Sequence, residues 1–293
     1  MRGYTSIRKG VYLNLIVLSD HPADVLNNQQ ASIHAENRAR QDRYNQQVDD
    51  LLHARASAWG RMVSAFKAHE LWCALSTFVL VLRLRMRKVP TFYFVPFQNN
   101  SMNALAAGIM GENSVVHYLH NQLGSEWTAI KGFQSRKGEA DLIAVGPHGI
   151  AVIEIKSLNG AFSCNGDAWW RDKYDNYGNV VQHNVPIADK GGRSPSKQVN
   201  DVADEVVNVL GRSGVQVPVA RLVILAHAKS HYGNFSNVTV HRIIRTEHLN
   251  LPEECARVCT PITAEMAGRV ISLLQADHKR GAMRSRQRVA AHR

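Results

Sequence analysis

Three charged side chains occupy the ends of two apolar segments in the stretch EADLIAVGPHGIAVIEIK, residues 139–156. Asp141 opens the first segment, and Glu154 and Lys156 close the second. The Gly-Pro-His-Gly sequence at residues 146–149 is typical of a tight turn, so the two segments are expected to pair as a β-hairpin. Residues two apart on a strand face the same side, and Glu154 and Lys156 are therefore expected to point together.

The hairpin would bring Asp141 beside Glu154, and this carboxylate pair suggests a metal site. Two neighbouring carboxylates repel each other and favour sharing a proton or a cation. Mg²⁺ suits such a site because it takes one or two carboxylates and keeps several waters; Mn²⁺ is the alternative. The Ile155 carbonyl would add a third protein oxygen. The Lys156 ammonium would orient an attacking water and offset the charge building on a phosphate, so the expected chemistry is phosphodiester hydrolysis.

The three residues by themselves also allow a simpler interpretation. An alternating Glu-Ile-Lys sequence is common on edge strands, where charged side chains face solvent. Lys156 would then form an ordinary surface ion pair with Asp141 or Glu154. The triplet alone favours this interpretation, and the choice depends on the residues around it.

The order of the surrounding residues resembles that of the nuclease-related domain family, which belongs to the PD-(D/E)xK nuclease superfamily. The resemblance covers about residues 107–210. Trp169-Trp170 resembles a tryptophan of the family, and Ser194 to Gln198 resembles its Asn-Pro-x-x-Gln segment, with Ser in place of Asn. The other matching residues are Gly108, Gly111, Glu112, Asp141, Leu142, Val145, Pro147, Gly149, Val152, Glu154, Lys156 and Gly160.

The resemblance implies an α/β fold with a restriction-endonuclease-like core, in which helices flank a mixed central sheet. It implies that Asp141 and Glu154 bind the metal and that Lys156 is the catalytic lysine. Glu112 would reach the same metal from the first helix, and Gln198 would line the site from the second. Glu112 also has a second interpretation, because an acid near the start of a helix is stabilised by the helix dipole.

The apolar periodicity predicts the elements that would position these residues. Helices are expected over residues 108–123, 196–210 and 263–276, and Ser194 or Ser196 is expected to cap the second of them. Strands are expected at 127–133, 141–145, 150–155, 217–226 and 237–244, with short strands around the Asn165-Gly166 turn. Residues 176–194 are rich in Gly, Asn and charge, which predicts a loop.

Three zones are expected along the chain: a largely helical extension at 1–100, the folded domain at 101–277 and a basic tail at 278–293. Within the extension, residues 71–82 are strongly apolar and are followed by Arg83, Arg85, Arg87 and Lys88. Crossing a bilayer takes roughly 20 apolar residues, so this segment is expected to be a buried or membrane-surface helix. A membrane surface or a protein is the partner expected for the extension. The tail is expected to be disordered or a helical extension, and either a nucleic-acid arm or a solvated terminus.

The charge balance points to a polyanion partner. Lys and Arg outnumber Asp and Glu by 35 to 24, which fits nucleic acid, and DNA first of all. The four cysteines form no CxxC pair, which is typical of a reducing compartment, so a cytoplasmic location is expected. Two functions are weighed on this basis: a metal-dependent nuclease, and a non-catalytic nucleic-acid-binding or membrane-associated adaptor that retains the fold.

Overall fold

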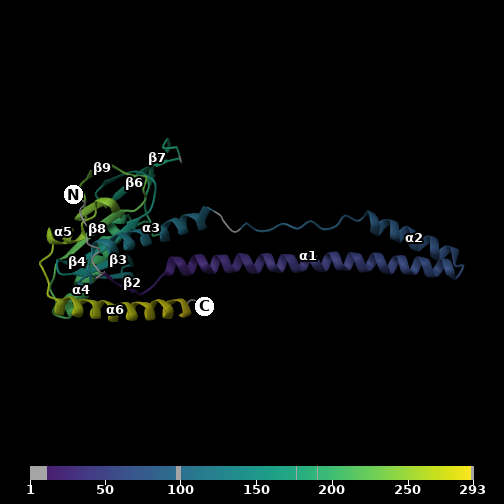
Figure 1. Ribbon diagram of the computed structural model, residues 1–293, viewed down its shortest axis with the longest axis horizontal. Helices are drawn as coiled ribbons and strands as arrows, with labels where there is room; N and C mark the ends of the chain where they lie inside the picture. The colour runs from purple at the N-terminus through teal and green to yellow at the C-terminus, as the bar shows by residue number, and fades with distance from the viewer. Residues whose placement is uncertain (1–11, 97–99, 176, 190, 292–293) are drawn as a thin grey trace, which may run out of the picture. The chain divides into compact units, whose positions relative to one another are not determined.

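The computed structural model describes residues 12–96, 100–175, 177–189 and 191–291 (Figure 1). The chain divides into two compact units. We call Met1–Asp24 with Asn103–Arg293 the sheet unit, and Val25–Met102 the hairpin unit. The hairpin unit lies within the expected extension over residues 1–100 except for its last two residues, and the described residues 12–24 are grouped with the sheet unit.

The sheet unit is built on a mixed six-stranded sheet, which confirms the expected fold class. β2, β3 and β4 run antiparallel, whereas β1 pairs parallel with β2, and β8 joins β4 and β10 by parallel pairing. In spatial order the strands are β1 (Asn14–Val17), β2 (Thr128–Gln134), β3 (Glu139–Gly146), β4 (Gly149–Lys156), β8 (Val219–Leu225) and β10 (Arg242–Arg245).

A smaller four-stranded sheet corrects one expectation, and strand β10 of the larger sheet corrects another. The expected loop at 176–194 contains a strand, and the expected strand at 237–244 is formed only from Arg242 onward. In spatial order this second sheet consists of β7 (Val180–Pro186), β6 (Ala168–Tyr174), β5 (Gly160–Asn165) and β9 (Ser230–Ser236).

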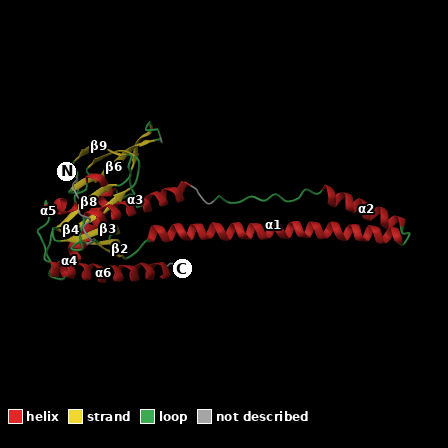
Figure 2. Ribbon diagram, viewed as in Figure 1, coloured by secondary structure: helices red, strands yellow, loops and turns green. Residues whose placement is uncertain are grey.

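Helices cover both faces of the larger sheet, as Figure 2 shows. On one face, Val115 and Leu119 pack with Ile153 of β4. On the other, Val202 and Val206 pack with Val152 of β4. The helices of this unit are α3 (Asn100–Gln122), α4 (Pro195–Arg212), α5 (Leu251–Ala256) and α6 (Ala264–Ala291), with a short 3₁₀ turn, η1, at Thr246–His248.

Two helix boundaries differ from the expected ones. α3 begins at Asn100 rather than at residue 108, and α6 continues to Ala291, so the basic tail starts as a helical extension. Ser194 caps α4, since its hydroxyl accepts a hydrogen bond from the Lys197 amide at 3.2 Å. This cap replaces the one that the family's Asn would supply.

The hairpin unit consists of α1 (His21–Lys67, whose first residues precede the unit) and the shorter α2 (Leu71–Met86). Ala58, Met62 and Val81 form its small core. Ala74 and Val81 are the residues of α2 that are buried, so the alternative of a buried helix at 71–82 is wrong. Within the described ranges, no helix combines the length and apolar character of a membrane span.

Candidate active site

The β3–β4 hairpin places two carboxylates across from each other, as expected. Its register pairs Leu142 with Ile153, so the next position sets Asp141 opposite Glu154. The Asp141 Oδ2 atom accepts a hydrogen bond of 2.7 Å from the Ile155 amide, which fixes that side chain against β4. The hydrogen bond involves the Ile155 amide and not its carbonyl, so the role of that carbonyl as a metal ligand stays a prediction.

Glu154 and Lys156 form a close ion pair inside the sheet. The Lys156 Nζ atom lies 2.5 Å from Glu154 Oε1, and the Glu154 residue is only 3% exposed. β4 lies between β3 and β8, so it is not an edge strand. The interpretation of Glu-Ile-Lys as a surface ion pair is therefore wrong, because solvent covers neither side of this strand's backbone.

Gln198 approaches the same lysine from the first turn of α4. Its Oε1 atom accepts a hydrogen bond from Lys156 Nζ at 3.4 Å, and its Nε2 atom donates to the Arg193 carbonyl at 2.8 Å. The Ser194 cap fixes the start of this helix and so the direction of the amide. Gln198 is thus oriented toward Lys156 by the backbone that precedes it.

Glu112 lies more than three turns into α3, which corrects the alternative that it serves the helix dipole. The dipole acts only within the first or last turn. The Glu112 carboxylate instead lies 3.4 Å from the ammonium of Lys131, a residue that is 5% exposed. Lys131 also lies 3.2 Å from Asp20 and donates to Asn113 Oδ1 at 3.1 Å.

These side chains surround a pocket of about 160 Å³. Five carboxylates and two cationic side chains are among the residues that line it. The negative charge therefore exceeds the positive charge at its wall. The carboxylates are those of Asp20, Glu112, Glu139, Asp141 and Glu154; the remaining lining residues are Ser19, Pro22, Lys131, Gly132, Arg193 and Gln198.

Burial sets the protonation of this cluster. It raises the pKa of Asp141 and of Glu154 above their ordinary values, and the negative charge of Asp141 raises that of Glu154 further. For Lys156, burial alone would lower the pKa, but the charges of Glu154 and Asp141 outweigh it and raise the pKa. Lys156 therefore stays an ammonium at neutral pH, and one of the two carboxylates gains from a proton or a cation.

The donor set fits a hard divalent cation. Two mutually repelling carboxylates in a wall of excess negative charge are the ligands that Mg²⁺ prefers, with water completing its shell. Among the residues that the structure describes, no three His, Cys, Asp or Glu side chains converge as a ready-made metal cage. Asp141 and Glu154 are accordingly the protein ligands that this geometry offers most directly, with Glu112 adjacent to them.

Four residues of the pocket were missed by sequence reasoning. Lys131 is buried, and its place inside the apolar run of β2 was the available signal. Glu139 lies two residues before Asp141 on β3, so the strand alternation was the available signal for it. Asp20 and Arg193 lie in segments that no pattern connected to the hairpin. Trp169, by contrast, packs outside the pocket: it is buried, and its Nε1 donates to Ser196 Oγ at 2.5 Å.

One comparison with known protein families finds a match that includes the β3–β4 hairpin. Residues 107–226 match the nuclease-related domain family, a match that runs from α3 to the end of β8. No curated protein and no solved structure matches the chain.

Proposed function

We propose that this chain, whose residues 107–226 match the nuclease-related domain family, is a metal-dependent nuclease that hydrolyses phosphodiester bonds of nucleic acid, with DNA as its substrate. The observation that supports the proposal is the arrangement of Asp141, Glu154 and Lys156. They come together at one buried point of a central strand pair, beside Gln198 from the flanking helix.

In this proposal Asp141 and Glu154 hold Mg²⁺ or Mn²⁺, with the Ile155 carbonyl and Glu112 as further ligands, the latter through water. When bound, the metal would polarise the phosphate and lower the pKa of a coordinated water. The protein's own contribution is to hold the two carboxylates side by side in the hairpin, where their burial and mutual repulsion favour binding of a cation.

Lys156 acts as a donor and not as a base, because it keeps its proton. Among the described residues its hydrogen-bond partners are Glu154 and Gln198, and an ammonium has three donors. The third donor is available to a water or a phosphate oxygen, where it offsets negative charge in the transition state. Gln198 positions Lys156 by accepting one of its other hydrogen bonds.

The partner and the compartment follow from charge and cysteine chemistry. The formal net charge of +11 favours a polyanion, although the pocket itself is acidic, so the phosphate backbone would bind around the pocket and meet a metal within it. All four cysteines are free, which is compatible with the proposed cytoplasmic location.

Cleavage assays on purified protein test the proposal. Double-stranded DNA, single-stranded DNA and RNA are incubated with Mg²⁺ or Mn²⁺. We expect Lys156→Ala to lower the cleavage rate by about 100-fold or more, the usual effect of losing one transition-state donor. Lys197→Ala is the matched control: it removes the same charge next to Gln198, but from a side chain that is 53% exposed, and should cut normally.

A metal titration separates the nuclease from the adaptor. Asp141→Asn keeps an oxygen to accept the Ile155 amide, so the fold is expected to survive while Mn²⁺ binding, followed by calorimetry, is lost. Cleavage that persists unchanged in both Lys156→Ala and Asp141→Asn would contradict the assignment. Salt-sensitive DNA binding with no cleavage by the wild type would favour the non-catalytic adaptor instead.

A further inference from the structure

The second helix of the hairpin unit carries two apolar stripes, of which only one is covered. Ala74 and Val81, seven residues apart, are buried in the unit. Leu71, Leu75, Phe78 and Leu82 follow one another at intervals of four, three and four residues, so they share another face of the helix. We call these four residues, together with Trp72 and Val79, the apolar face of α2.

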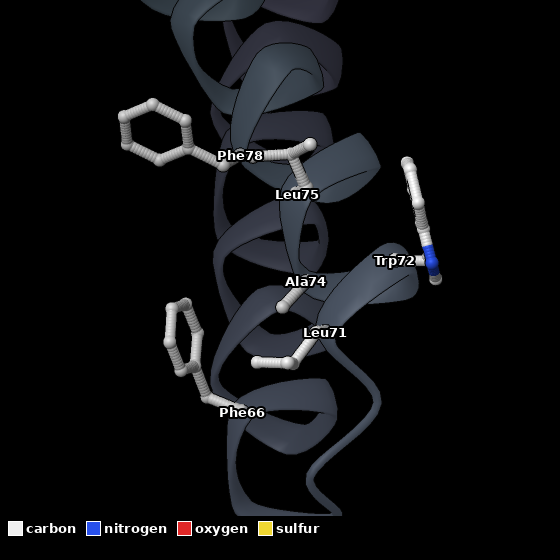
Figure 3. Close-up of a pocket in the computed structure, with 6 residues that line it drawn as sticks. All are labelled: Phe66, Leu71, Trp72, Ala74, Leu75 and Phe78. Carbon is white, nitrogen blue, oxygen red and sulfur yellow. The ribbon is translucent and has the colours of Figure 1, made fainter.

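The apolar face is exposed along its length. Trp72 is 86% exposed and Leu71 is 73% exposed, and the other members are between 44% and 58% exposed. Phe66 of α1 adds to it, and an open hollow of about 600 Å³ is lined by Phe66, Leu71, Trp72, Ala74, Leu75 and Phe78. Figure 3 shows Phe66 and Phe78 projecting from the two helices on one side and Trp72 on the other. An exposed apolar patch of this kind on a soluble domain marks an interaction site.

Charge identifies the kind of partner. Between residues 55 and 96 there are seven Lys and Arg residues and a single acid, Glu70. Four of the basic residues, Arg83, Arg85, Arg87 and Lys88, follow the apolar face directly. An apolar surface bordered by cations is complementary to a bilayer with anionic headgroups. A second copy of the hairpin would carry the same positive excess and would be repelled.

The dimensions favour a helix that lies on the bilayer. The 16 residues of α2 span about 24 Å at about 1.5 Å per residue, less than the roughly 30 Å of hydrocarbon in a bilayer. The polar residues Lys67, His69 and Glu70 precede the helix and would be costly to bury deeply. With α2 lying flat, its apolar face enters the acyl boundary, Trp72 sits at headgroup depth, and the arginines reach lipid phosphates.

We propose that the hairpin unit docks on anionic membrane surfaces through the apolar face of α2, and that Arg83 to Lys88 bind the lipid headgroups. This inference is independent of the nuclease site. The apolar face of α2 would contact lipid, whereas the buried Val81 on another side of the helix packs against α1.

Vesicle flotation of the full chain tests this proposal. The wild type should float with vesicles of phosphatidylcholine and phosphatidylserine, and partition at least about tenfold more weakly into phosphatidylcholine alone, as expected when several cations lose their headgroup partners. Trp72→Ser with Leu75→Ser should abolish flotation. Both side chains are more than half exposed, so the unit keeps its helices, which circular dichroism checks. Tyr177→Ser, at a site 92% exposed in the other unit, is the control and should float normally.

Cys73 supplies an independent readout. It is exposed, whereas Cys164, Cys255 and Cys259 are buried, so an environment-sensitive dye can be attached at this position in the otherwise native protein. Cys73 lies about 200° around the helix from Leu71, opposite the apolar face. The emission of the dye should therefore stay nearly unchanged when anionic vesicles bind, whereas a shift to the blue would mean that the helix inserts rather than lies flat. A wild type that does not float, or a double variant that floats as well as the wild type, would overturn the proposal. So would a lipid-free dimer that the double substitution disrupts while leaving vesicle binding unchanged.

Discussion

At the level of single residues, Lys131 shows how the protein keeps an acidic pocket folded. Its ammonium lies between Glu112, Asp20 and Asn113, with almost no exposure to solvent. Burial raises the pKa of Glu112, and the charge of Lys131 opposes that rise. Lys131 is thus a fixed cation in the wall of the pocket, while Lys156 pairs with Glu154 behind that wall.

We expect Lys131→Met to destabilise the protein by about 3 kcal/mol, because breaking a buried pair leaves an unpaired carboxylate in the pocket. Adding Glu112→Gln removes that charge and should recover part of the loss. Urea unfolding of the wild type, both single variants and the double variant measures the coupling. If Lys131→Met lowers the free energy of unfolding equally with Glu112 and with Gln at position 112, the ion pair contributes nothing to stability.

Gly132 and Ser19 shape the part of the pocket beside Asp141. Gly132 lies opposite Asp141 in the β2–β3 register, and its φ of +68° is a conformation that other residues adopt at a cost. A Cβ atom at this position would lie 2.1 Å from the Ser19 carbonyl oxygen. Glycine therefore lets the segment after β1 close over the pocket beside Asp141.

Replacing Gly132 by Ala should cost about 3 kcal/mol, from backbone strain together with the collision with Ser19. Gly214→Ala is a matched control, because Gly214 has a similar φ of +72° but nothing within 4 Å of its Cβ position. It should cost only about 1 kcal/mol, the strain alone. Chemical denaturation compares the two variants, and equal losses would mean that the approach of Ser19 has no energetic weight.

At the level of elements, the strong periodic segments were predictable and the weak ones were not. β3, β4, β8 and α4 are apolar on their buried faces, and the sequence pattern finds all of them. β7 was missed because Val180 to Pro186 is almost entirely exposed, so its pairing with β6 leaves no apolar pattern. β9 was missed because it is polar and interrupted by Gly233.

The same reasoning explains the limits at the site. The hairpin follows from local sequence, so the meeting of Asp141 with Glu154 could be expected. The partners of Glu112 could not, because Lys131 and Asp20 approach it from β2 and from the segment after β1. The approach of Asp20 depends on the parallel pairing of Asn14–Val17 with β2. This pairing joins segments far apart in the sequence, so no local pattern predicts it.

Helix α6 adds a pH-sensitive contact to the sheet. The Gln134 amide donates a hydrogen bond of 3.0 Å to His278 Nδ1, which requires a neutral ring. Burial lowers the pKa of His278 from its ordinary value near 6.5, while the charges of Glu139 and Asp277 oppose that change. The folded state therefore binds this proton less readily than the unfolded state.

The resulting stabilisation is complete above the ordinary pKa of 6.5 and is lost as the pH falls from there through the lowered value. We expect the melting temperature of the wild type to fall more steeply than that of His278→Phe as the pH decreases below this point. Parallel pH profiles of thermal unfolding followed by circular dichroism, for the two proteins, provide the measurement. Parallel slopes would exclude His278 as a contributor.

At the level of the whole molecule, the family match and the folded unit have different extents. The match ends with β8 at residue 226, but β10 pairs with β8 from beyond it and β1 pairs with β2 from before it. Val270 and Leu274 of α6 also belong to the core under the sheet. The β3–β4 hairpin therefore lies in a sheet whose two outer strands come from outside the matched region.

We expect a fragment of residues 107–226 to lose cooperative folding, because β2 and β8 would become bare edges and the layer formed by α6 would be missing. A fragment of residues 103–291 keeps β10 and α6 and should melt in a single transition. Thermal unfolding followed by circular dichroism distinguishes them. A sharp transition for the shorter fragment would show that the matched region is a self-sufficient domain.

The alternation along β4 constrains how this protein can diverge. Glu154 lines the pocket and pairs with Lys156 on the same side of β4, while Ile153 and Ile155 face the opposite apolar layer. Deleting or inserting one residue between the hairpin turn and the end of β4 would exchange these two sets and drive both charges into the hydrocarbon layer. Strand β4 can therefore accept substitutions but not changes of length. Insertions that respect the site should be confined to exposed connections, such as residues 177–179 between β6 and β7.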